Sequence, residues 1–498
     1  MRLKVFGFFV ALYAVTTAGH IYTIDSYLNY AVTRSIGTQA SLEIPRFMMT
    51  VEGVGGHHYS KLGIGQSLVS LIPYWIGALV ERFSPANPAF RAYSHRFTIP
   101  HNSGAIHAEP QTLIRISDQD GARVCFTTLT NVFIAGAVCL IFWLLLRDLG
   151  LSSRGALWGT VLLGFSTPLW VYSRDLFAEP LFAACLLGTF YLLTSGAGEG
   201  RGGRMLVAGL ISSLGILARV SFVPIALIFA VHILLASKDR TETRGLLLRY
   251  CVGCLPGVLV VGLLNLHKFG SPFLSGYHTA FDKGFAIPLG QGLTWILFSP
   301  YRSLFLYAPA VVLFGFGLAG YAKRYRGRFW LMISVIVYTF LVYSKWWAWH
   351  GGWCWGPRFL LPIIPLLLLP GLVAVKEGGK RLLGVAIGLG VLGFCVQLGG
   401  VLINYTAAYD YWIKIGKLDW SEAEIHRLFP IWVHTKALLA TDPVHYDLWI
   451  IQALQTGSKA WLGLVAGGGA LIAYAVRGIR RRGRPGKHSM SSRRTQVE

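Results

Sequence analysis

The sequence has few charged residues, and acidic ones are fewer than basic ones. Charged residues make up 13% of its 498 residues, and 22 acidic side chains stand against 45 lysines and arginines, which gives a net charge of +23. It also has no P-loop, no GxSxG and no HExxH motif, so nothing in it supports an ATPase, a serine hydrolase or a zincin. It contains no convincing internal repeat and no stretch that predicts an independent soluble domain.

The seven cysteines give no framework for disulfides or a metal. Cys251 and Cys254 form one close pair, but no second pair matches it, so the spacing does not indicate a zinc site. Most of the cysteines lie inside apolar runs, namely Cys139, Cys185, Cys251, Cys254 and Cys395.

Apolar sequence, in contrast, is abundant. Hydrophobic residues make up 54% of the chain, the mean hydropathy is +0.53, and long apolar runs recur almost to the end. The basic residues fall in short loops between these runs and in the tail RGIRRRGRPGKHSMSSRR, a pattern typical of the inner side of a membrane. The sequence therefore predicts an all-α polytopic membrane protein that binds no nucleic acid and whose tail contacts membrane lipid.

The order of apolar runs and basic loops predicts the topology. MRLK followed by VFGFFVALYAVTTAG looks like a signal peptide, but the site before His20 lacks an A-x-A pattern, so we expect an uncleaved first helix. The basic tail is placed inside. Reading back from it, the alternation predicts spans at 460–476, 382–403, 359–375, 329–344, 303–321, 247–266, 220–237, 205–218, 177–195, 155–172 and 124–146.

The run 64–81 does not fit this alternation as a simple crossing. Span 124–146 must run from outside to inside, whereas MRLK orients the first helix from inside to outside. The run is therefore predicted to be a re-entrant or juxtamembrane helix, with all of 25–123 outside and about 12 true spans. An outward N-terminus is the alternative.

This topology divides the chain into four parts. The largest is a transmembrane module that includes two long outer loops, and an amphipathic region on the outer face follows it. In order, the parts are the module 1–403 with loops 25–123 and 267–302, the amphipathic region 404–459, the last span 460–476 and the basic cytoplasmic tail 477–498.

One outer stretch gathers reactive side chains between two apolar runs. Asp25 ends the first apolar segment, and the loop after it carries Glu43, Glu52 and the cluster His57-His58-Tyr59-Ser60-Lys61. A carboxylate at a membrane interface, with imidazoles and an ammonium near it, indicates chemistry at the bilayer surface. The same residues would also fit an ordinary solvated loop.

Other outer turns add charged and aromatic side chains. Arg219, between two apolar runs, needs either snorkelling or an anion such as a lipid phosphate. The segment KWWAWHGGWCWGPR, residues 345–358, is here called the tryptophan-rich turn. Its indoles fit a membrane interface, and they are also good surfaces for sugar rings. The candidates in these turns are Arg174, Asp175, Glu179, Arg219, Tyr301, Arg302, Trp346, Trp347, Trp349, His350, Trp353, Trp355 and Arg358.

The order of these motifs along residues 1–375 resembles the GT-C superfamily of membrane glycosyltransferases, and within it the bacterial relatives of protein O-mannosyltransferases and of the lipid A aminoarabinose transferase. Ser26 stands where O-mannosyltransferases have a second acid, and Gly63-Ile64-Gly65 replaces a Pro-Pro pair. The motifs that carry the resemblance are Asp25 after the first span, YSKLGIGQSLVSLIP, YSRDLFAEPLFA, SPYRSLFLYAP and WWAWHGGWCWGPRFLLPIIPLL.

The resemblance implies a GT-C-type bundle with outer loops and juxtamembrane helices in the cytoplasmic membrane, with its active site on the outer, periplasmic side. Such an enzyme moves a sugar from a polyprenyl-phosphate donor to a lipid, glycan or protein acceptor, usually with inversion. Asp25 would be the base on the acceptor hydroxyl, because a partly desolvated carboxylate can have its pKa raised toward a useful value.

The other candidates take roles around this base. Positive charge would hold the lipid phosphate, and imidazoles would orient the acceptor. No cofactor is required, although a divalent cation is compatible with the site. The implied roles are Lys61, Arg219, Arg302 and Arg358 on the phosphate, Glu179 orienting Lys61 or a histidine or helping to bind a metal, His57, His58 and His350 on the acceptor, and Tyr59, Arg174, Asp175, Tyr301, Trp347 and Trp349 lining the substrate site.

Two other classes of function compete with this one. A transporter or flippase of lipid-linked sugars would also need arginines and a hydrophobic groove, but it should carry charges inside its spans or paired broken helices. A scaffolding protein would not explain why carboxylates, imidazoles and cations gather on one side. The concentration of ionisable residues in the outer loops favours an enzyme. The sugar, the acceptor, the length of the carrier and the metal dependence stay open.

Overall fold

The computed structural model describes most of the chain. The polar insert between Arg82 and Arg123, the predicted last span 460–476 and the tail 477–498 lie almost entirely outside the described residues. Those are 1–21, 23–46, 49–83, 120–195, 200–236, 239–277, 283–406, 408–409, 412, 425–439, 446–451, 466 and 469–470.

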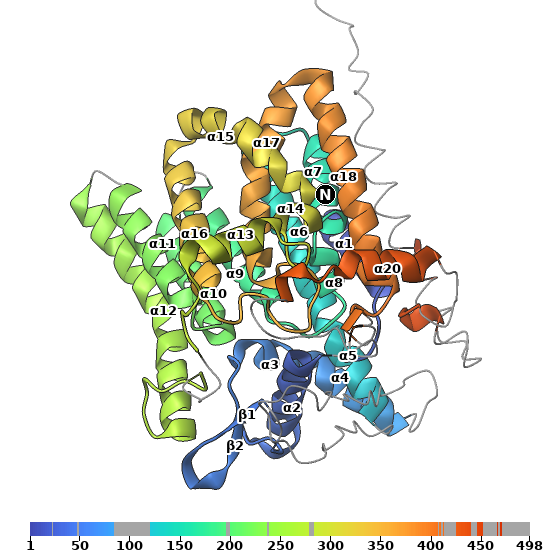
Figure 1. Ribbon diagram of the computed structural model, residues 1–498. Coiled ribbons are helices and arrows are strands. Elements are labelled where there is room, and N and C mark those ends of the chain that lie inside the picture. Colours follow the sequence, from blue (N-terminus) through green and yellow to red (C-terminus); the bar gives the residue numbers. More distant parts are fainter. Residues whose placement is uncertain are drawn as a thin grey trace, which may run out of the picture.

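The described residues form a helical bundle (Figure 1). Six of its helical segments are long and apolar enough to cross a membrane, which supports the predicted all-α multi-pass protein; the predicted number of about 12 spans is not confirmed. Shorter apolar helices are α9 (Glu179–Thr194), α11 (Phe222–Ala236) and α13 (Leu289–Phe298). The six long segments consist of α5 (Gly121–Thr128) with α6 (Thr130–Asp148), α10 (Arg201–Ala218), α12 (Arg240–Phe269), α16 (Arg326–Lys345), η4 (Arg358–Ile363) with α17 (Ile364–Glu377), and α18 (Gly379–Leu402).

Two segments predicted as single spans, 155–172 and 303–321, are instead broken near a proline. Proline has no backbone N–H and its ring clashes with the preceding turn, so a regular helix cannot continue through Pro168 or Pro309. These two predictions of an uninterrupted helix were wrong. The resulting pieces are α7 (Ser153–Phe165), α8 (Leu169–Tyr172), α14 (Leu304–Tyr307), η3 (Pro309–Val312) and α15 (Leu313–Arg324).

The first helix, α1 (Arg2–Val15), packs inside the bundle against α6 and α7. Phe9 stacks on Phe165 with 5.6 Å between ring centroids, and the Tyr13 hydroxyl donates to the Gly164 carbonyl at 3.0 Å. Eight residues separate α1 from a second helix, α2 (Ile24–Gln39). It carries Asp25 in its first turn, where a carboxylate interacts favourably with the helix dipole.

The run 64–81 does not form one long helix. It is split into α3 (Gly65–Val69) and α4 (Leu71–Phe83), and 13 residues span only about 20 Å, less than the roughly 30 Å of a bilayer core. The exposed side of α4 carries Trp75 and Leu79, as expected of a helix that lies on an interface. This geometry supports the predicted juxtamembrane segment.

A small hairpin completes this end of the molecule. Strands β1 (Thr50–Glu52) and β2 (His58–Ser60) pair antiparallel with Val51 opposite Tyr59. In Figure 1 the hairpin, α2, α3 and α4 lie together below the bundle. The predicted outer segment therefore gathers at one end of the fold.

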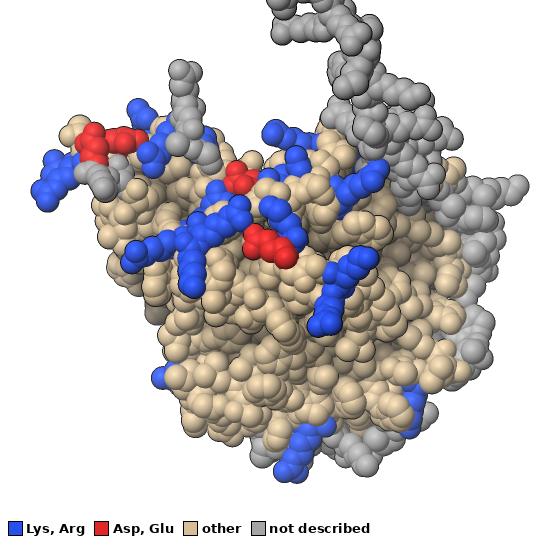
Figure 2. All heavy atoms as spheres, turned by 90° about the horizontal axis from the view of Figure 1, so that it is seen from above, with Lys and Arg blue, Asp and Glu red and all other residues tan. Residues whose placement is uncertain are grey.

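The opposite end of the bundle is rich in Lys and Arg (Figure 2). Its few acidic residues are paired, with Glu377 on Arg324 at 2.7 Å and Asp148 on Arg328. This charge asymmetry is the observation on which the predicted orientation rests. The basic residues at helix ends of this side are Arg147, Arg154, Arg201, Arg204, Arg240, Arg244, Lys323, Arg324, Arg326, Arg328, Lys376, Lys380 and Arg381.

One segment predicted as an outer loop contains a helix, and the predicted amphipathic region contains two. The stretch 267–302, taken as a loop, includes α13, and the stretch 404–459 includes η5 (Ile425–Arg427) and α20 (Pro430–Leu439). Helix α20 is amphipathic as predicted, because His434 is buried against the Gly399 carbonyl at 2.9 Å while Trp432 is exposed.

Candidate functional site

Four charged side chains from distant parts of the chain meet beside the first turn of α2. The Arg358 guanidinium lies 2.5 Å from the Asp25 carboxylate and 3.2 Å from the Glu179 carboxylate. The Glu179 carboxylate also lies 2.8 Å from the guanidinium of Arg219. We call these four residues the charge cluster. It joins the start of α2, the start of α9, the end of α10 and the start of η4.

The side chains of the charge cluster are largely buried, so each charge needs its partner. The side chain of Glu179 is 2% exposed and that of Arg358 9%, while Asp25 and Arg219 keep 18% and 17%. Two carboxylates and two guanidinium groups compensate one another, and removing one member would leave an unpaired buried charge. Asp25 and Arg219 are the members that a ligand can reach most easily.

The pKa of Asp25 is shifted in the direction opposite to the prediction. Burial raises the pKa of this carboxyl, but Arg358 lowers it by charge and by a hydrogen bond, and Lys61 and Arg219 lower it further. The net result is a lowered pKa, so the expected raised value is wrong. The reason is the number of cations that the fold brings to Asp25, which the local sequence does not show.

Lys61 reaches the same place from the turn between β2 and α3. Its ammonium lies 5.7 Å from the centroid of the Tyr277 ring and acts electrostatically on Asp25. The turn passes very close to the end of α10, since a Cβ on Gly63 would lie 2.4 Å from the Ala218 carbonyl oxygen. Only glycine fits such an approach, which explains Gly63 in this sequence.

Aromatic rings flank the two guanidinium groups. The Phe359 ring lies 4.8 Å from both Arg219 and Arg358, and Phe177 lies 4.9 Å from Arg358. These cation–π contacts hold planar guanidinium groups in fixed orientations. Neither ring was predicted as part of the site, although Phe359 directly follows Arg358 in the sequence.

A small cavity opens beside the cluster. It has a volume of about 20 Å³, enough for one water molecule. Asp25, Asn29, Glu179, Arg219 and Tyr277 are among its lining residues. Polar groups of both charges therefore converge on a space where a small reacting group would fit.

Comparison with solved structures identifies the fold. The chain aligns with the crystal structure of ArnT from Cupriavidus metallidurans in the apo state, with a TM-score of 0.51 and 15% sequence identity, over 94% of this chain and 75% of ArnT. The chain has a GT-C fold. The resemblance seen in the sequence is thus confirmed at the level of fold.

A second alignment is weaker. The archaeal oligosaccharyltransferase AglB from Archaeoglobus fulgidus, in complex with an inhibitory peptide and a dolichol-phosphate, aligns with a TM-score of 0.40 and 12% identity, over 92% of this chain and 56% of AglB. No protein-family model matches the sequence, and no curated protein is significantly similar to it.

Within the GT-C fold, Arg174 and Asp175 hold the bundle together. Arg174 is completely buried and donates to the carbonyls of Thr16 at 2.7 Å and Gly400 at 3.1 Å, and it also bonds to Asp447. Asp175, also fully buried, accepts bonds from Thr23, Tyr405 and the Leu176 N–H. The prediction that this pair lines the substrate site is not supported, because neither side chain is accessible.

Arg302 has a similar structural position. It is 1% exposed and donates to the carbonyls of His350 at 2.7 Å and Gly352 at 2.8 Å, and also to the hydroxyl of Tyr409. The Tyr301 hydroxyl donates to the same Tyr409 hydroxyl at 3.0 Å. Tyr301 and Arg302 therefore fix the tryptophan-rich turn through bonds to its carbonyls and to Tyr409.

The predicted residues of the tryptophan-rich turn also make packing and backbone contacts. Burial and the charges of Arg302 and Arg358 lower the pKa of His350 to about 3, so its imidazole is neutral and accepts from the Gly352 N–H at 3.0 Å. Trp349 stacks on Trp295 at 5.0 Å. The backbone N–H of Trp347 donates to Gly284 at 2.9 Å. These contacts describe a packed turn next to the cluster.

The hairpin residues stand apart from the cluster. His57 pairs with Glu43 at 2.9 Å, and both side chains are about half exposed. His58 lies opposite Glu52 in the hairpin, and the Tyr59 ring packs against His267 of α12 at 6.2 Å. Of the predicted cluster from His57 to Lys61, the structure gives only Lys61 a link to Asp25.

The roles expected of Glu179 also change. It pairs with two arginines, and neither Lys61 nor a histidine is its partner. Among the described residues, no group of three or more His, Cys, Asp or Glu side chains could hold a metal ion.

Proposed function

We propose that this protein is a glycosyltransferase that moves a sugar from a polyprenyl-phosphate donor to a hydroxyl of an acceptor, at the outer face of the cytoplasmic membrane. The observation that carries this proposal is the pairing of the Asp25 carboxylate with Arg358 inside the charge cluster, at the end of the fold that holds α2 and the hairpin. A carboxylate surrounded by cations at the end of an apolar bundle suits an acceptor hydroxyl and a lipid phosphate together.

In the proposed reaction the acceptor oxygen forms a bond to the sugar carbon as the bond from that carbon to the phosphate oxygen breaks. The acceptor proton goes to Asp25, and the lipid phosphate leaves as an anion. The lowered pKa makes Asp25 a weak base at the start. It holds the hydroxyl by a hydrogen bond and takes the proton once the forming bond has made that hydroxyl more acidic.

The leaving phosphate needs positive charge, which Arg219, Arg358 and Lys61 supply. A phosphate that accepts from Arg358 competes with Asp25 for the same guanidinium, so donor binding frees the carboxylate for the acceptor. Glu179 then acts as a positioning residue, because it keeps its contacts to both arginines. This exchange couples the presence of the donor to the availability of the base.

The alternative of a flippase gains nothing from the structure. A transporter of lipid-linked sugars needs charges along a path through its spans. In the part of the chain that the structure describes, the members of the charge cluster lie at the starts and ends of helices. That placement fits a reaction at one membrane face.

The test is Asp25→Asn, which keeps the side-chain shape and removes the basicity. Membranes containing the variant at wild-type abundance are assayed for consumption of polyprenyl-phosphate sugars extracted from the same cells. We expect turnover to fall by about 10²–10⁴-fold, the usual cost of losing a positioned base. The control is Asp148→Asn, which also removes a carboxylate paired with an arginine, but at the opposite end of the bundle. Turnover of Asp25→Asn within about tenfold of wild type would contradict the proposal.

A further inference from the structure

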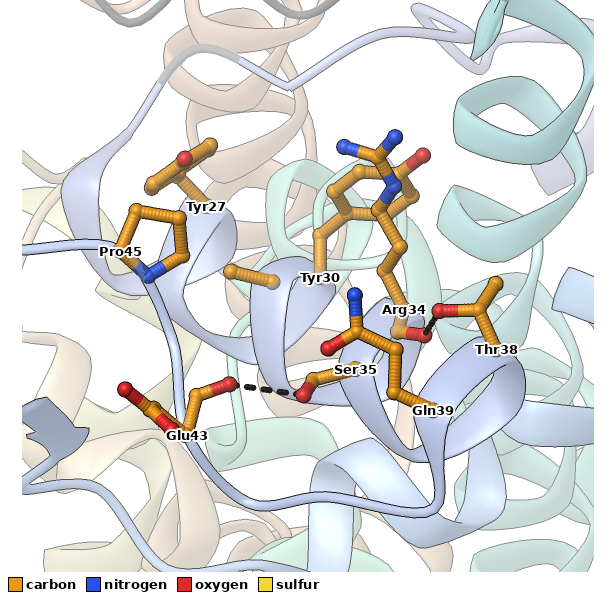
Figure 3. A pocket seen from close by; sticks show the side chains of 9 residues that line it. Tyr27, Tyr30, Arg34, Ser35, Thr38, Gln39, Glu43 and Pro45 are labelled. Carbon is orange, nitrogen blue, oxygen red and sulfur yellow. Dashed lines mark hydrogen bonds between the residues drawn. The ribbon is translucent and has the colours of Figure 1, made fainter. Parts of the chain in front are cut away.

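A second cavity lies along α2, on a different face from Asp25. It has a volume of about 380 Å³, within the range of small-molecule sites. Tyr27 follows Asp25 by two positions, which is about 200° around the helix, so the cavity faces away from the charge cluster. Figure 3 shows it between α2 and the returning segment that carries Glu43 and Pro45. We call it the α2 groove.

The α2 groove is polar, and both of its charged lining residues have partners. Its lining consists mainly of hydroxyl, amide and charged side chains. Arg34 lies 3.3 Å from the Asp120 carboxylate, and Glu43 lies 2.9 Å from His57. A ligand here meets many hydrogen-bonding groups without a strong net charge. The lining residues are Tyr27, Tyr30, Ala31, Arg34, Ser35, Thr38, Gln39, Glu43 and Pro45.

One group in the groove is left unsatisfied. The side chain of Tyr30 is 2% exposed, and its hydroxyl has no hydrogen-bond partner among the described residues. Figure 3 shows this hydroxyl next to the guanidinium of Arg34, and both Arg34 and Asp120 act on it electrostatically. A buried hydroxyl without a partner costs free energy, and a ligand hydroxyl would remove that cost.

We propose that the α2 groove binds an uncharged saccharide that forms part of the acceptor. The opposite charges of Arg34 and Glu43 favour a neutral ligand over an ion, and the Tyr27 ring and Pro45 offer an apolar surface for the face of a sugar ring. Tyr30, Gln39 and Ser35 offer donors and acceptors for its hydroxyls. Tyr27 shares the first turn of α2 with Asp25, so the groove begins within one helical turn of the charge cluster. This inference rests on the proposed function, because it assigns the bound sugar to the acceptor.

The test measures binding directly. The full-length protein in phosphatidylcholine nanodiscs, without sugar-based detergent, is mixed with the neutral disaccharides maltose, cellobiose, lactose, mannobiose and chitobiose. Saturation-transfer NMR reports which of them bind. We expect binding of at least one, weakened roughly 3- to 10-fold by Tyr30→Phe and by Gln39→Ala, since each removes hydrogen bonds to the ligand.

The matched control is Tyr321→Phe. Tyr321 is 1% exposed and its hydroxyl also lacks a partner among the described residues, but it lies on α15 at the other end of the bundle. We expect this variant to bind like wild type. Binding of none of the disaccharides, or equal binding by wild type, Tyr30→Phe and Gln39→Ala, would overturn the inference. So would tenfold tighter binding of the anionic cellobiouronic acid than of cellobiose.

This result is independent of the proposed chemistry. Asp25→Asn should bind the disaccharide like wild type, because Asp25 does not line the groove. If the proposed function is wrong, Asp25→Asn keeps the turnover of the wild type while the groove still binds the disaccharide. If the groove is not a saccharide site, no disaccharide binds there while turnover still depends on Asp25.

Discussion

The guanidinium of Arg358 lies 2.5 Å from the Asp25 carboxylate and 3.2 Å from that of Glu179. One side chain is therefore the strongest influence that lowers the pKa of the proposed base, and it is itself held by a second, more deeply buried carboxylate. A donor phosphate would compete directly with Asp25 for this guanidinium. Arg358 is thus the residue through which donor binding and base availability are linked.

The first prediction concerns the shape of the two cluster arginines. Arg219→Lys and Arg358→Lys keep the positive charge but lose the planar fork and the fixed stacking on Phe359. We expect each to raise the KM for the polyprenyl-phosphate donor by about tenfold or more, because a charged bidentate contact is typically worth 1.5–3 kcal/mol. Unchanged KM values in both variants would mean that these arginines do not contact the donor.

Arg302→Lys serves as the contrast to these variants. Its guanidinium donates to the carbonyls of His350 and Gly352 in the tryptophan-rich turn. We expect it to lower the Tm of the purified protein and to leave the donor KM of the remaining folded enzyme unchanged. A raised donor KM without a change in Tm would indicate that Arg302 contacts the donor phosphate.

These different roles show what the sequence could and could not reveal. Asp25, Glu179, Arg219 and Arg358 were each recognisable, because a charge at the end of an apolar segment needs a partner. Arg174 and Arg302 look the same in sequence, yet their partners are mainly backbone carbonyls of turns and helix ends. Such carbonyls become available only through the three-dimensional path of the chain. A local pattern cannot predict them.

The fold was predictable to a similar degree. Apolar length and loop charge located the long helices and the split segment 64–81. The breaks at Pro168 and Pro309 were missed, because apolar composition outweighed the prolines in the prediction. The α2 groove was also beyond the sequence, since it depends on how the segment with Glu43 and Pro45 returns along α2.

A second prediction tests the orientation of the fold. Thr38 is exposed on α2 and Lys380 is exposed at the opposite, basic end. In a background without the exposed Cys251 and Cys395, Thr38→Cys should react in intact cells with a membrane-impermeant maleimide, whereas Lys380→Cys should react only after permeabilisation. Ser173 is fully buried and is unsuitable as a label site. The reverse labelling pattern would place the charge cluster on the inner side.

A third prediction concerns the close approach at Gly63. A Cβ there would lie 2.4 Å from a backbone oxygen of Ala218, which cannot move aside alone. Gly63→Ala should therefore displace Lys61 and Arg219, cost about 1–3 kcal/mol of stability and reduce turnover. Gly203→Ala on α10, where a Cβ meets nothing within 4 Å, is the control and should lower neither stability nor turnover. Wild-type Tm and turnover in Gly63→Ala would show that the approach is looser than described.

The last prediction follows from the lowered pKa of Asp25. A carboxyl whose pKa is lower in the folded than in the unfolded protein adds stability above its unfolded pKa, and this is lost as the pH falls through the folded pKa. The charged, active form of Asp25 should therefore persist below the usual pKa of an aspartate in the wild type. In Arg358→Gln the largest lowering influence is gone while burial still raises the pKa, so the acidic limb of turnover at saturating donor should move to higher pH. Arg324→Gln, which breaks the exposed pair with Glu377, should leave that limb in place. Equal acidic limbs in Arg358→Gln and the wild type would show that turnover does not report the titration of Asp25.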